Sequence, residues 1–539
     1  MKTSDLIVKA LENEGVEYIF GLPGEENLDL LESIRKSDQI KMITVRHEQG
    51  AGYMAATYGR LTGKAGVCMA TLGPGALNLF NPAAYAQLGA MPMLMLTGQK
   101  PLKDRKQGNF QIIDVVKMLQ PLTKTSKQLT YGENATSTIR ELFRKSEEER
   151  PGVVHLEIPE DVAKEDVKDF TIFDVISNKI PTVNHDNLSD AKQLILNAKH
   201  PLLLIGADAN RKRCCNALTK LVNTLKIPFI DTQMAKGIID ERNDLYIGTA
   251  VLSANDIVHK AIDYADLIIN VGHDTIEKPP FVMSHNDDTK VIHINFFEAE
   301  INEVYFPHLN LIGDIATTVT ELTKVLKNDL KTKNEYFLDI KNKIIEENQP
   351  YADDNRFPIL PQNLVKLARN IIPEDGIITL DNGIYKLWFS RNYPTYSLNT
   401  LLLDNALATM GAGFASAIMT KLLHPSKKVV SINGDGGFMM NSQELETAVR
   451  LNLDLVVIIL NDSAYGMIEW KQNKEGFKDY GLKYKNPDFI KYAESFGANG
   501  YKPNSVEAFK SIFEKVINEK GVHVIDLAID YSLNEKLLG

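Results

Sequence analysis

Apolar residues follow two patterns along this chain, helical spacing and short unbroken runs. The N-terminal segment 4–14 has apolar residues at helical spacing, and an Ala-rich stretch at 48–62 predicts a second helix that ends at Gly63. Short, mostly apolar runs occupy residues 18–20, 41–45, 66–70 and 93–96. Because these runs lack polar alternation, they are typical of a parallel sheet that helices cover on both faces.

The same order of short apolar runs and longer amphipathic stretches returns twice. The later runs are 201–205, 228–230, 267–271 and 291–294, and then 377–380, 429–432, 455–460 and 522–526. Polar stretches at 165–190 and 344–360 separate the three groups and are expected to be linkers. The pattern predicts an α/β protein of three domains, each a mostly parallel sheet flanked by helices, at residues 1–170, 185–328 and 355–539.

Composition agrees with this organisation and narrows the class of protein. A length of 539 residues suits three or four domains of roughly 150 residues each. The net charge of −10 argues against a protein that binds nucleic acid or an anionic membrane. No apolar run approaches the roughly 20 residues of a membrane span, and acidic residues interrupt the N-terminal segment where a signal peptide needs an apolar core. With only three cysteines, the chain is expected in the reducing cytoplasm.

Oxygen-rich segments follow two successive runs near the C-terminus. The run 429–432 leads into Gly434-Asp435-Gly436-Gly437, before a helix expected near Asn441, and the run 455–460 ends in the segment 461–467. Open α/β sheets bind ligands at such strand ends. Glycines let a phosphate approach the backbone, and carboxylates suit Mg²⁺. Each segment alone reads as a turn or a helix cap, but two aspartates 27 residues apart, Asp435 and Asp462, favour a site for Mg²⁺ and a phosphate.

This spacing resembles the cofactor motif of thiamine diphosphate enzymes. The resemblance implies that Mg²⁺ is held by Asp435, Asp462 and the main-chain carbonyl of Ala464. It also implies that the cofactor contacts Gly434, Gly436, Gly437, Tyr465, Gly466 and Met467.

A second candidate, Glu48, follows the run 41–45. A single glutamate there is usually a helix cap or a surface carboxylate. In the enzymes that the motif resembles, a glutamate in this place hydrogen-bonds the aminopyrimidine ring of the cofactor and promotes loss of its C2 proton. Glu48 precedes Asp435 by 387 residues, so the cofactor is expected to span two domains. In that family the two domains come from different subunits, which implies a homodimer or homotetramer with active sites at the subunit interface.

The resemblance covers nearly the whole chain and narrows to the acetohydroxyacid and acetolactate synthases. The segments that carry it are 21–24, 46–49, 59–63, 72–78, 110–111, 120–124, 408–411 and 443–448. It implies a pyrimidine-binding first domain, a middle domain and a diphosphate-binding third domain. Further cofactor contacts implied in this way are Gly24, Gly73, Asn78, Gly383, Ile384, Tyr385, Ala408 and Met410.

The same resemblance gives roles to four of these residues. Phe110 and Gln111 line the reacting centre, where Gln111 donates to the carbonyl oxygen of the substrate as it gains charge. Met410 bends the cofactor, and the carbonyl of Ala408 accepts from its amino group. The implied reaction decarboxylates pyruvate on thiamine diphosphate and joins the two-carbon unit to a second pyruvate, giving 2-acetolactate.

Two differences from the anabolic enzymes of this family bear on the cofactor and on the substrate. The anabolic enzymes carry an Arg-Phe-Asp-Asp-Arg segment in the middle domain, whereas the stretch 271–280 here differs from it, so FAD is not expected. They also place a tryptophan where this chain has Lys471, with Trp470 one position early, which favours pyruvate as both substrates. A role in branched-chain amino acid or in acetoin synthesis stays open.

Two alternatives remain at this point. The nearer one is another thiamine diphosphate enzyme, a 2-keto acid decarboxylase or a pyruvate oxidase. The other is a nucleotide-binding oxidoreductase or a non-catalytic α/β binding module. It is disfavoured because neither Gly73-Pro-Gly75 nor Gly434-Asp-Gly436 completes the dinucleotide-binding fingerprint.

Overall fold

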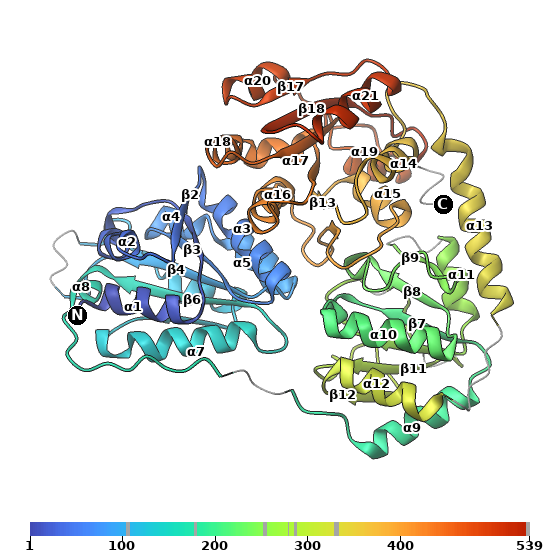
Figure 1. The fold of residues 1–539 in the computed structure, drawn as a ribbon, viewed down its shortest axis with the longest axis horizontal. Helices are drawn as coiled ribbons and strands as arrows, with labels where there is room; N and C mark the ends of the chain where they lie inside the picture. The colour runs from blue at the N-terminus through green and yellow to red at the C-terminus, as the bar shows by residue number, and fades with distance from the viewer. Residues whose placement is uncertain are drawn as a thin grey trace.

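The computed structural model describes residues 1–103, 108–176, 180–251, 256–278, 280–284, 288–327 and 334–534. These residues form three units, each one six-stranded sheet with its helices (Figure 1). Every strand pairing within the three sheets is parallel. The predicted α/β architecture is therefore confirmed, and each predicted domain range encloses one sheet, while the domain boundaries themselves stay a prediction.

The N-terminal unit has the strand order β2-β1-β3-β4-β6-β5. Its strands are β1 (Tyr18–Gly21), β2 (Lys41–Thr44), β3 (Gly66–Ala70), β4 (Met93–Gln99), β5 (Thr125–Gln128) and β6 (Val153–Pro159). Its helices are α1 (Thr3–Asn13), α2 (Leu28–Arg35), α3 (Glu48–Thr62), α4 (Gly73–Leu77), α5 (Phe80–Leu88), α6 (Val115–Leu119), α7 (Ala135–Glu147) and α8 (Glu160–Lys164).

The middle unit has the order β12-β11-β10-β7-β8-β9. Its strands are β7 (Pro201–Ile205), β8 (Phe229–Thr232), β9 (Tyr246–Ala250), β10 (Leu267–Val271), β11 (Lys290–Asn295) and β12 (Leu309–Ile312). Its helices are α9 (His185–Asn197), α10 (Lys212–Leu225), α11 (Ile257–Tyr264) and α12 (Ile315–Leu326), and α13 (Glu335–Ala352) leads to the last unit.

The C-terminal unit has the order β14-β13-β15-β16-β18-β17. Its strands are β13 (Ile377–Leu380), β14 (Leu401–Leu402), β15 (Val429–Gly434), β16 (Leu455–Asn461), β17 (Asn499–Tyr501) and β18 (Val522–Ala528). Its helices are α14 (Pro361–Ile371), α15 (Ile384–Asn392), α16 (Ala412–Leu423), α17 (Asp435–Asn441), α18 (Leu445–Arg450), α19 (Gly466–Lys474), α20 (Phe489–Ser495) and α21 (Val506–Val516).

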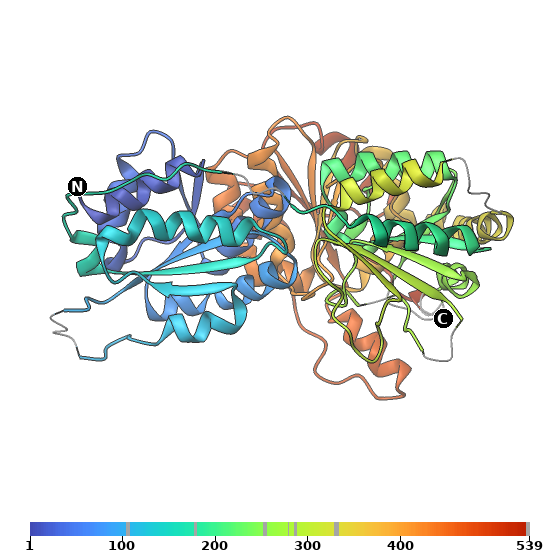
Figure 2. The ribbon, with the colours of Figure 1, turned by 90° about the horizontal axis from the view of Figure 1, so that it is seen from below.

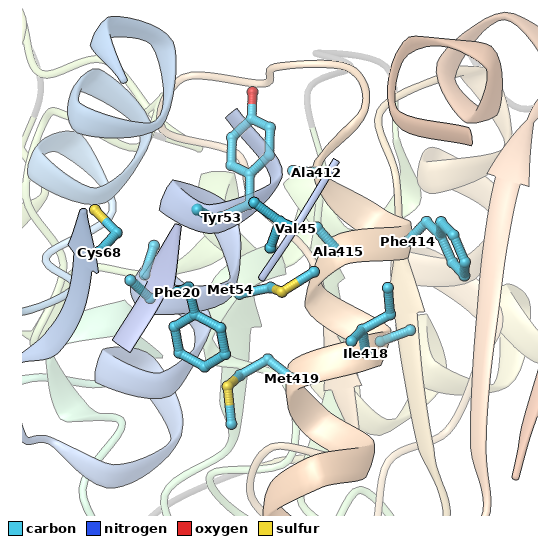
Figure 3. Packing of buried hydrophobic residues seen from close by; sticks show 14 of the residues in the cluster. Phe20, Val45, Tyr53, Met54, Cys68, Ala412, Phe414, Ala415, Ile418 and Met419 are labelled. Carbon is cyan, nitrogen blue, oxygen red and sulfur yellow. The ribbon is translucent and has the colours of Figure 1, made fainter. Parts of the chain in front are cut away.

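The N-terminal and C-terminal units share one hydrophobic core. Helix α3 packs beside α16 in both ribbon views (Figures 1 and 2). Figure 3 shows Tyr53 and Met54 of α3 next to Ala412, Ala415 and Met419 of α16, all buried. Because burial of one large apolar side chain contributes about 1.5–3 kcal/mol, this contact holds the two units together.

Two local expectations were wrong. The linker expected at 344–360 is partly helical, because α13 continues to Ala352. The helix expected near Asn441 begins earlier, at Asp435, so Gly436 and Gly437 lie inside its first turn rather than in a loop. Their small size there serves close packing, which the sequence alone does not distinguish from a turn. Within the described ranges, no helix combines the length and hydropathy that crossing a membrane requires.

Candidate functional site

A groove of about 300 Å³ lies at the carboxyl ends of β13, β15 and β16. We call it the C-terminal half-site. The predicted residues that line it are Gly383, Ile384, Tyr385, Ala408, Met410, Gly434, Asp435, Gly436, Gly437, Asp462, Ala464, Tyr465, Gly466 and Met467. The direct pairing of β15 with β16 explains their proximity, since Gly434 is the register partner of Leu460. Every residue predicted in this part of the chain therefore meets at one place.

Asp435, the first residue of α17, lies in a dense hydrogen-bond network. One carboxylate oxygen accepts from the backbone N–H of Ser463 at 2.8 Å and from the side-chain amide of Asn486 at 2.6 Å. The other accepts from the hydroxyl of Tyr484 at 2.9 Å. These contacts fix the carboxylate at the start of α17, beside the tip of β16.

Asp462 is much less well compensated. Its carboxylate accepts from the backbone N–H of Ala464 at 3.3 Å, and burial together with the charge of Asp435 raises its pKa to about 7. Among the described residues, neither Asp435 nor Asp462 forms an ion pair with lysine or arginine. Two adjacent carboxylates that lack a cationic partner, next to the carbonyl of Ala464, provide the oxygen ligands that Mg²⁺ prefers.

The described part of the chain contains no cluster of three or more His, Cys, Asp or Glu side chains suited to a metal ion. A magnesium site here accordingly depends on two carboxylates and a main-chain carbonyl, with the phosphate of a ligand completing the coordination. The side chain of the neighbouring Asn461 is engaged elsewhere, because its amide donates to Asp526 at 2.8 Å.

The groove also suits a diphosphate. Helices α15 and α19 begin beside it, at Ile384 and Gly466, and helix N-termini favour anions. The hydroxyl of Tyr385 is buried in the lining without a hydrogen-bond acceptor among the described residues, and burial raises its pKa well above the usual value. A Cβ added to Gly436 would lie 2.7 Å from the hydroxyl oxygen of Tyr484, so a larger residue there would displace that hydroxyl. A phosphate oxygen would supply the acceptor that Tyr385 lacks.

The turn 404–411 presents Ala408 and Met410 to the groove. Ala408 has a φ of 57°, and its N–H donates to the carboxylate of Asp404 at 2.7 Å. Lys386, also in the lining, donates to the backbone carbonyl of Asp404 at 2.9 Å and to the side chain of Asn382 at 2.7 Å. The same Asn382 donates to the carbonyl of Thr409 at 2.6 Å. The unusual backbone of Ala408 is thus held by side chains on both sides of the turn.

The far end of this turn is held by Asp381. Its buried carboxylate accepts from the N–H groups of Gly411 at 2.8 Å and Ala412 at 3.1 Å, at the start of α16. Burial raises the pKa of Asp381 to about 6 in spite of these donors. Sequence reasoning missed the supporting roles of Asp381, Asn382, Lys386, Asp404, Tyr484 and Asn486. Only the first three lie beside residues predicted as cofactor contacts, Gly383, Ile384 and Tyr385, and nothing local marks Tyr484 or Asn486.

Glu48 lies in a second cluster, in the N-terminal unit. It is the first residue of α3, where the ring of His47 accepts from the N–H of Gln49 at 3.1 Å and caps the helix. The Glu48 side chain is buried and accepts from the amide of Asn78 at 2.9 Å. A Cβ added to Gly75 would lie 3.2 Å from the second Glu48 oxygen, so a small residue leaves that oxygen accessible.

Four further predicted residues lie in the same unit as Glu48 and Asn78. We call the six together the N-terminal half-site: Gly24, Glu48, Gly73, Asn78, Phe110 and Gln111. Gly73 has a φ of 46°, and a Cβ there would lie 2.7 Å from the carbonyl oxygen of Gln111. Gly24 packs directly against Thr71, which also contacts Gly75. Phe110 is 62% exposed, and the side chain of Gln111 is also exposed.

Within the described part of one chain, the residues of the N-terminal half-site lie outside the groove. The described residues that line the groove all belong to the C-terminal unit, and Glu48, Phe110 and Gln111 are not among them. Both half-sites carry exposed apolar side chains nearby: Leu77, Phe110 and Met118 in the N-terminal unit, and Tyr465, Ile468, Phe477 and Tyr480 in the C-terminal unit.

Comparisons with known proteins agree with this division. Residues 1–118 match the family "Thiamine pyrophosphate enzyme, N-terminal TPP binding domain", residues 188–322 its central domain and residues 381–527 its C-terminal TPP binding domain. An acetolactate synthase of Bacillus subtilis (strain 168) is 33% identical over 99% of this chain and 94% of its own length. A probable acetolactate synthase large subunit of Methanococcus aeolicus is 32% identical over 99% and 92%. A catabolic acetolactate synthase of Raoultella terrigena is 31% identical over 99% and 96%.

Proposed function

The chain belongs to the acetolactate synthase family of thiamine pyrophosphate enzymes, and from this premise we propose that it converts two molecules of pyruvate into 2-acetolactate and carbon dioxide in the cytoplasm. The observation that supports this most is the pair of half-sites. One has the carboxylates, helix N-termini and glycines that suit a magnesium diphosphate, and the other has a buried glutamate held by Asn78.

In this proposal the C-terminal half-site holds the cofactor. Asp435, Asp462 and the carbonyl of Ala464 would hold Mg²⁺, and Tyr385 would donate to a phosphate oxygen. Ala408 and Met410 are held at the groove by the turn described above, where the carbonyl of Ala408 can accept from the cofactor's amino group. When bound, thiamine diphosphate supplies a ring carbon that adds to a ketone and accepts the electron pair left by departing carbon dioxide.

The N-terminal half-site provides the proton chemistry. Glu48 holds a proton against the aminopyrimidine ring, and its hydrogen bond from Asn78 keeps the carboxylate oriented. Gln111 donates to the carbonyl oxygen of the substrate as negative charge gathers there, and Phe110 keeps water away from the reacting carbon. Exclusion of water matters because protonation by water would divert the reaction to acetaldehyde.

Two copies of the chain are required in this proposal. Glu48 lies outside the groove of its own chain, and apolar side chains are exposed around both half-sites. Contact between the N-terminal half-site of one copy and the groove of another would cover those side chains and complete two sites in a homodimer, or in each dimer of a homotetramer.

We further propose that the middle unit holds no flavin. The ends of β7 and β10 carry Asp208 and Asp274, and the guanidinium of Arg150 lies 3.1 Å from Asp274. Burial and the charge of Asp274 raise the pKa of Asp208 well above its usual range. Arg150 also lies 3.8 Å from Asp208, so both carboxylates engage this guanidinium and keep it from the diphosphate of a flavin. Residue 279 of the stretch 271–280 lies outside the described residues.

Pyruvate is the proposed acceptor as well as the donor. Lys471 is exposed on α19, and its ammonium lies 5.0 Å from the centre of the Trp470 ring, which packs against the core of the C-terminal unit. A lysine, charged at its tip, offers less apolar surface than a tryptophan to the longer side chain of 2-ketobutyrate.

The experiment that tests the proposal is product analysis with pyruvate, with and without thiamine diphosphate, Mg²⁺ and FAD. The expected result is 2-acetolactate, dependent on the first two additions and unchanged by FAD. Acetaldehyde as the main product would indicate a 2-keto acid decarboxylase, and acetyl phosphate or acetate a pyruvate oxidase. A stoichiometric flavin in the purified protein would contradict the flavin-free assignment.

A further inference from the structure

Glu444 is a buried carboxylate of the C-terminal unit that contacts the N-terminal unit of its own chain. It ends a short 3-10 turn, Ser442–Glu444, just before α18. One carboxylate oxygen accepts from the backbone N–H of Arg46 at 3.0 Å and of His47 at 3.1 Å. The other accepts from the hydroxyl of Thr447 at 2.6 Å. Both partners in the N-terminal unit directly precede Glu48.

These two amides belong to the segment that carries Glu48 into the N-terminal half-site. At a helix start the backbone N–H groups have no intrahelical acceptor, so an external carboxylate both satisfies and locates them. A Cβ added to Gly50 would lie 2.9 Å from the same oxygen of Glu444, so Glu444 also packs against the first turn of α3. Glu444 therefore contacts the chain on both sides of Glu48.

A second contact runs along the same border. The side-chain amide of Asn441 donates to the carbonyl of Gly411 at 2.8 Å and to the side chain of Gln49 at 3.3 Å. Gln49 follows Glu48, and Gly411 follows Met410. The C-terminal unit thus contacts the residues next to Glu48 and the turn of its own groove together.

We propose that Glu444 is a positioning residue for Glu48, holding the backbone of Arg46 and His47 so that the Glu48 carboxylate stands at the productive place. This inference rests on the proposed function. In the proposed dimer it also means that each C-terminal unit serves two sites, one through its groove and the other through Glu444, which acts on the Glu48 of its own chain.

The competing interpretation is that Glu444 only joins two units. A matched control separates the two interpretations, because the same units also share the hydrogen bond of 2.9 Å between Thr57 and Ser416, further along α3 and away from Glu48. Ser416→Ala removes this buried interdomain contact and leaves the start of α3 unchanged. Glu444→Ala removes the acceptor of both amides.

The test compares wild type, Glu444→Ala, Glu444→Gln and Ser416→Ala. The first readout is amide hydrogen exchange over residues 44–52 in the cofactor-free protein. The second is C2 proton exchange of bound thiamine diphosphate, with kcat and KM for pyruvate. We expect Glu444→Ala to exchange Arg46 and His47 faster and to slow C2 exchange and kcat by roughly 10- to 100-fold, with KM within about twofold, because small displacements of a reacting group are costly.

The remaining variants complete the comparison. Glu444→Gln keeps an oxygen that can accept from both amides, so it is expected to recover most of the C2 exchange rate. Ser416→Ala should match wild type in both readouts. If Glu444→Ala does not fold, Glu444→Asp, which withdraws the carboxylate by one methylene, takes its place with the same expectation.

Wild-type C2 exchange in Glu444→Ala, or an equal loss in Ser416→Ala, would overturn the inference. A wild-type protein that forms acetolactate while Glu444→Ala behaves normally refutes this inference alone. If the wild-type protein shows no C2 exchange, the proposed function is refuted, and Glu444 then has no catalytic role. That holds even if Glu444→Ala still lowers the amide protection of residues 46 and 47.

Discussion

The side-chain amide of Asn78 donates a hydrogen bond of 2.9 Å to Glu48, so one oxygen of this buried carboxylate is held and the other is left for a partner. Asn78 directly follows α4, and Glu48 begins α3. The two helices follow β3 and β2, which lie on either side of β1 in the sheet. The relationship gives the N-terminal half-site its one oriented carboxylate. It also identifies the first substitution to test.

Glu48→Gln keeps the size of the side chain and its contact with Asn78 but removes the proton acceptor. We expect thermal stability within about 1 kcal/mol of wild type and a fall of roughly 10²–10⁴-fold in C2 proton exchange and acetolactate formation. Proton exchange measured by NMR and a melting curve check the two parts. The control is Glu32→Gln, an exposed glutamate paired with Arg35, which should change neither. Near-normal carboligation by Glu48→Gln would remove Glu48 from the mechanism.

Asp462 and Asp435 lack a cationic partner among the described residues, so metal binding should be measurable without turnover. In wild type we expect Mg²⁺ with thiamine diphosphate to raise the melting temperature, and a chelator to reverse the rise. Asp462→Asn should lose most of this stabilisation while the ligand-free protein becomes no less stable, because a carboxylate with a raised pKa is replaced by a neutral group. Equal stabilisation of wild type and Asp462→Asn by Mg²⁺ would exclude Asp462 as a ligand.

Gly436 tests the shape of the groove. The Cβ of Gly436→Ala would approach the hydroxyl of Tyr484 at 2.7 Å and the ring of Tyr465 at 3.0 Å, displacing the donor that fixes Asp435. We expect the Kd for thiamine diphosphate, measured by calorimetry in the presence of Mg²⁺, to rise at least about tenfold, which corresponds to 1.4 kcal/mol. Unchanged affinity would show that the cofactor does not need this close approach.

Asp381 gives a pH-dependent prediction. Its pKa is about 6 in the folded chain against an ordinary 3.8, so the folded state binds the proton more tightly. Its contribution to stability is present below pH 4 and is lost as pH rises towards 6. Relative to wild type, Asp381→Asn should therefore gain stability between pH 4 and pH 6, by up to about 3 kcal/mol. Urea unfolding followed at several pH values checks this, and a difference independent of pH would contradict it.

The twelve runs predicted as strands are all strands. Eleven of them are inner strands, which must be apolar on both faces, and β2 is an edge strand. Five of the six strands that the pattern missed, β5, β9, β12, β14 and β17, lie at sheet edges in the described part of the chain. An edge strand needs only one partner and can be short or polar. The sixth, β6, is an inner strand that contains two buried polar residues, His155 and Glu157. Their side chains form hydrogen bonds with Thr97 and Gln99 of β4. These hydrogen bonds join residues far apart in the sequence, so the pattern around β6 alone does not indicate a buried strand.

Some residues of the candidate site could be predicted from the sequence, and the residues that hold them in place could not. Asp435, Asp462 and Glu48 could be predicted because a motif and a strand end mark each of them. The residues that hold them, Tyr484, Asn486, Asp404 and Glu444, contact their partners through the fold and not through neighbouring sequence. Glu444 lies 398 residues from Arg46, a separation that no local pattern can report.

The separation of the two half-sites permits one decisive complementation experiment. Glu48→Gln damages the N-terminal half-site, and Asp462→Asn damages the groove. The two variants are co-expressed with different affinity tags, and the mixed dimer is purified through both tags. Each mixed dimer then contains one site with both defects and one site with none.

The measurement is acetolactate formation from pyruvate by this mixed dimer, beside the two single-variant proteins. Completion of each site by two copies predicts that both single-variant proteins are nearly inactive and that the mixed dimer recovers about half of the wild-type activity per dimer. If the mixed dimer is as inactive as its parents, the two half-sites do not act across subunits and the proposed site is contradicted.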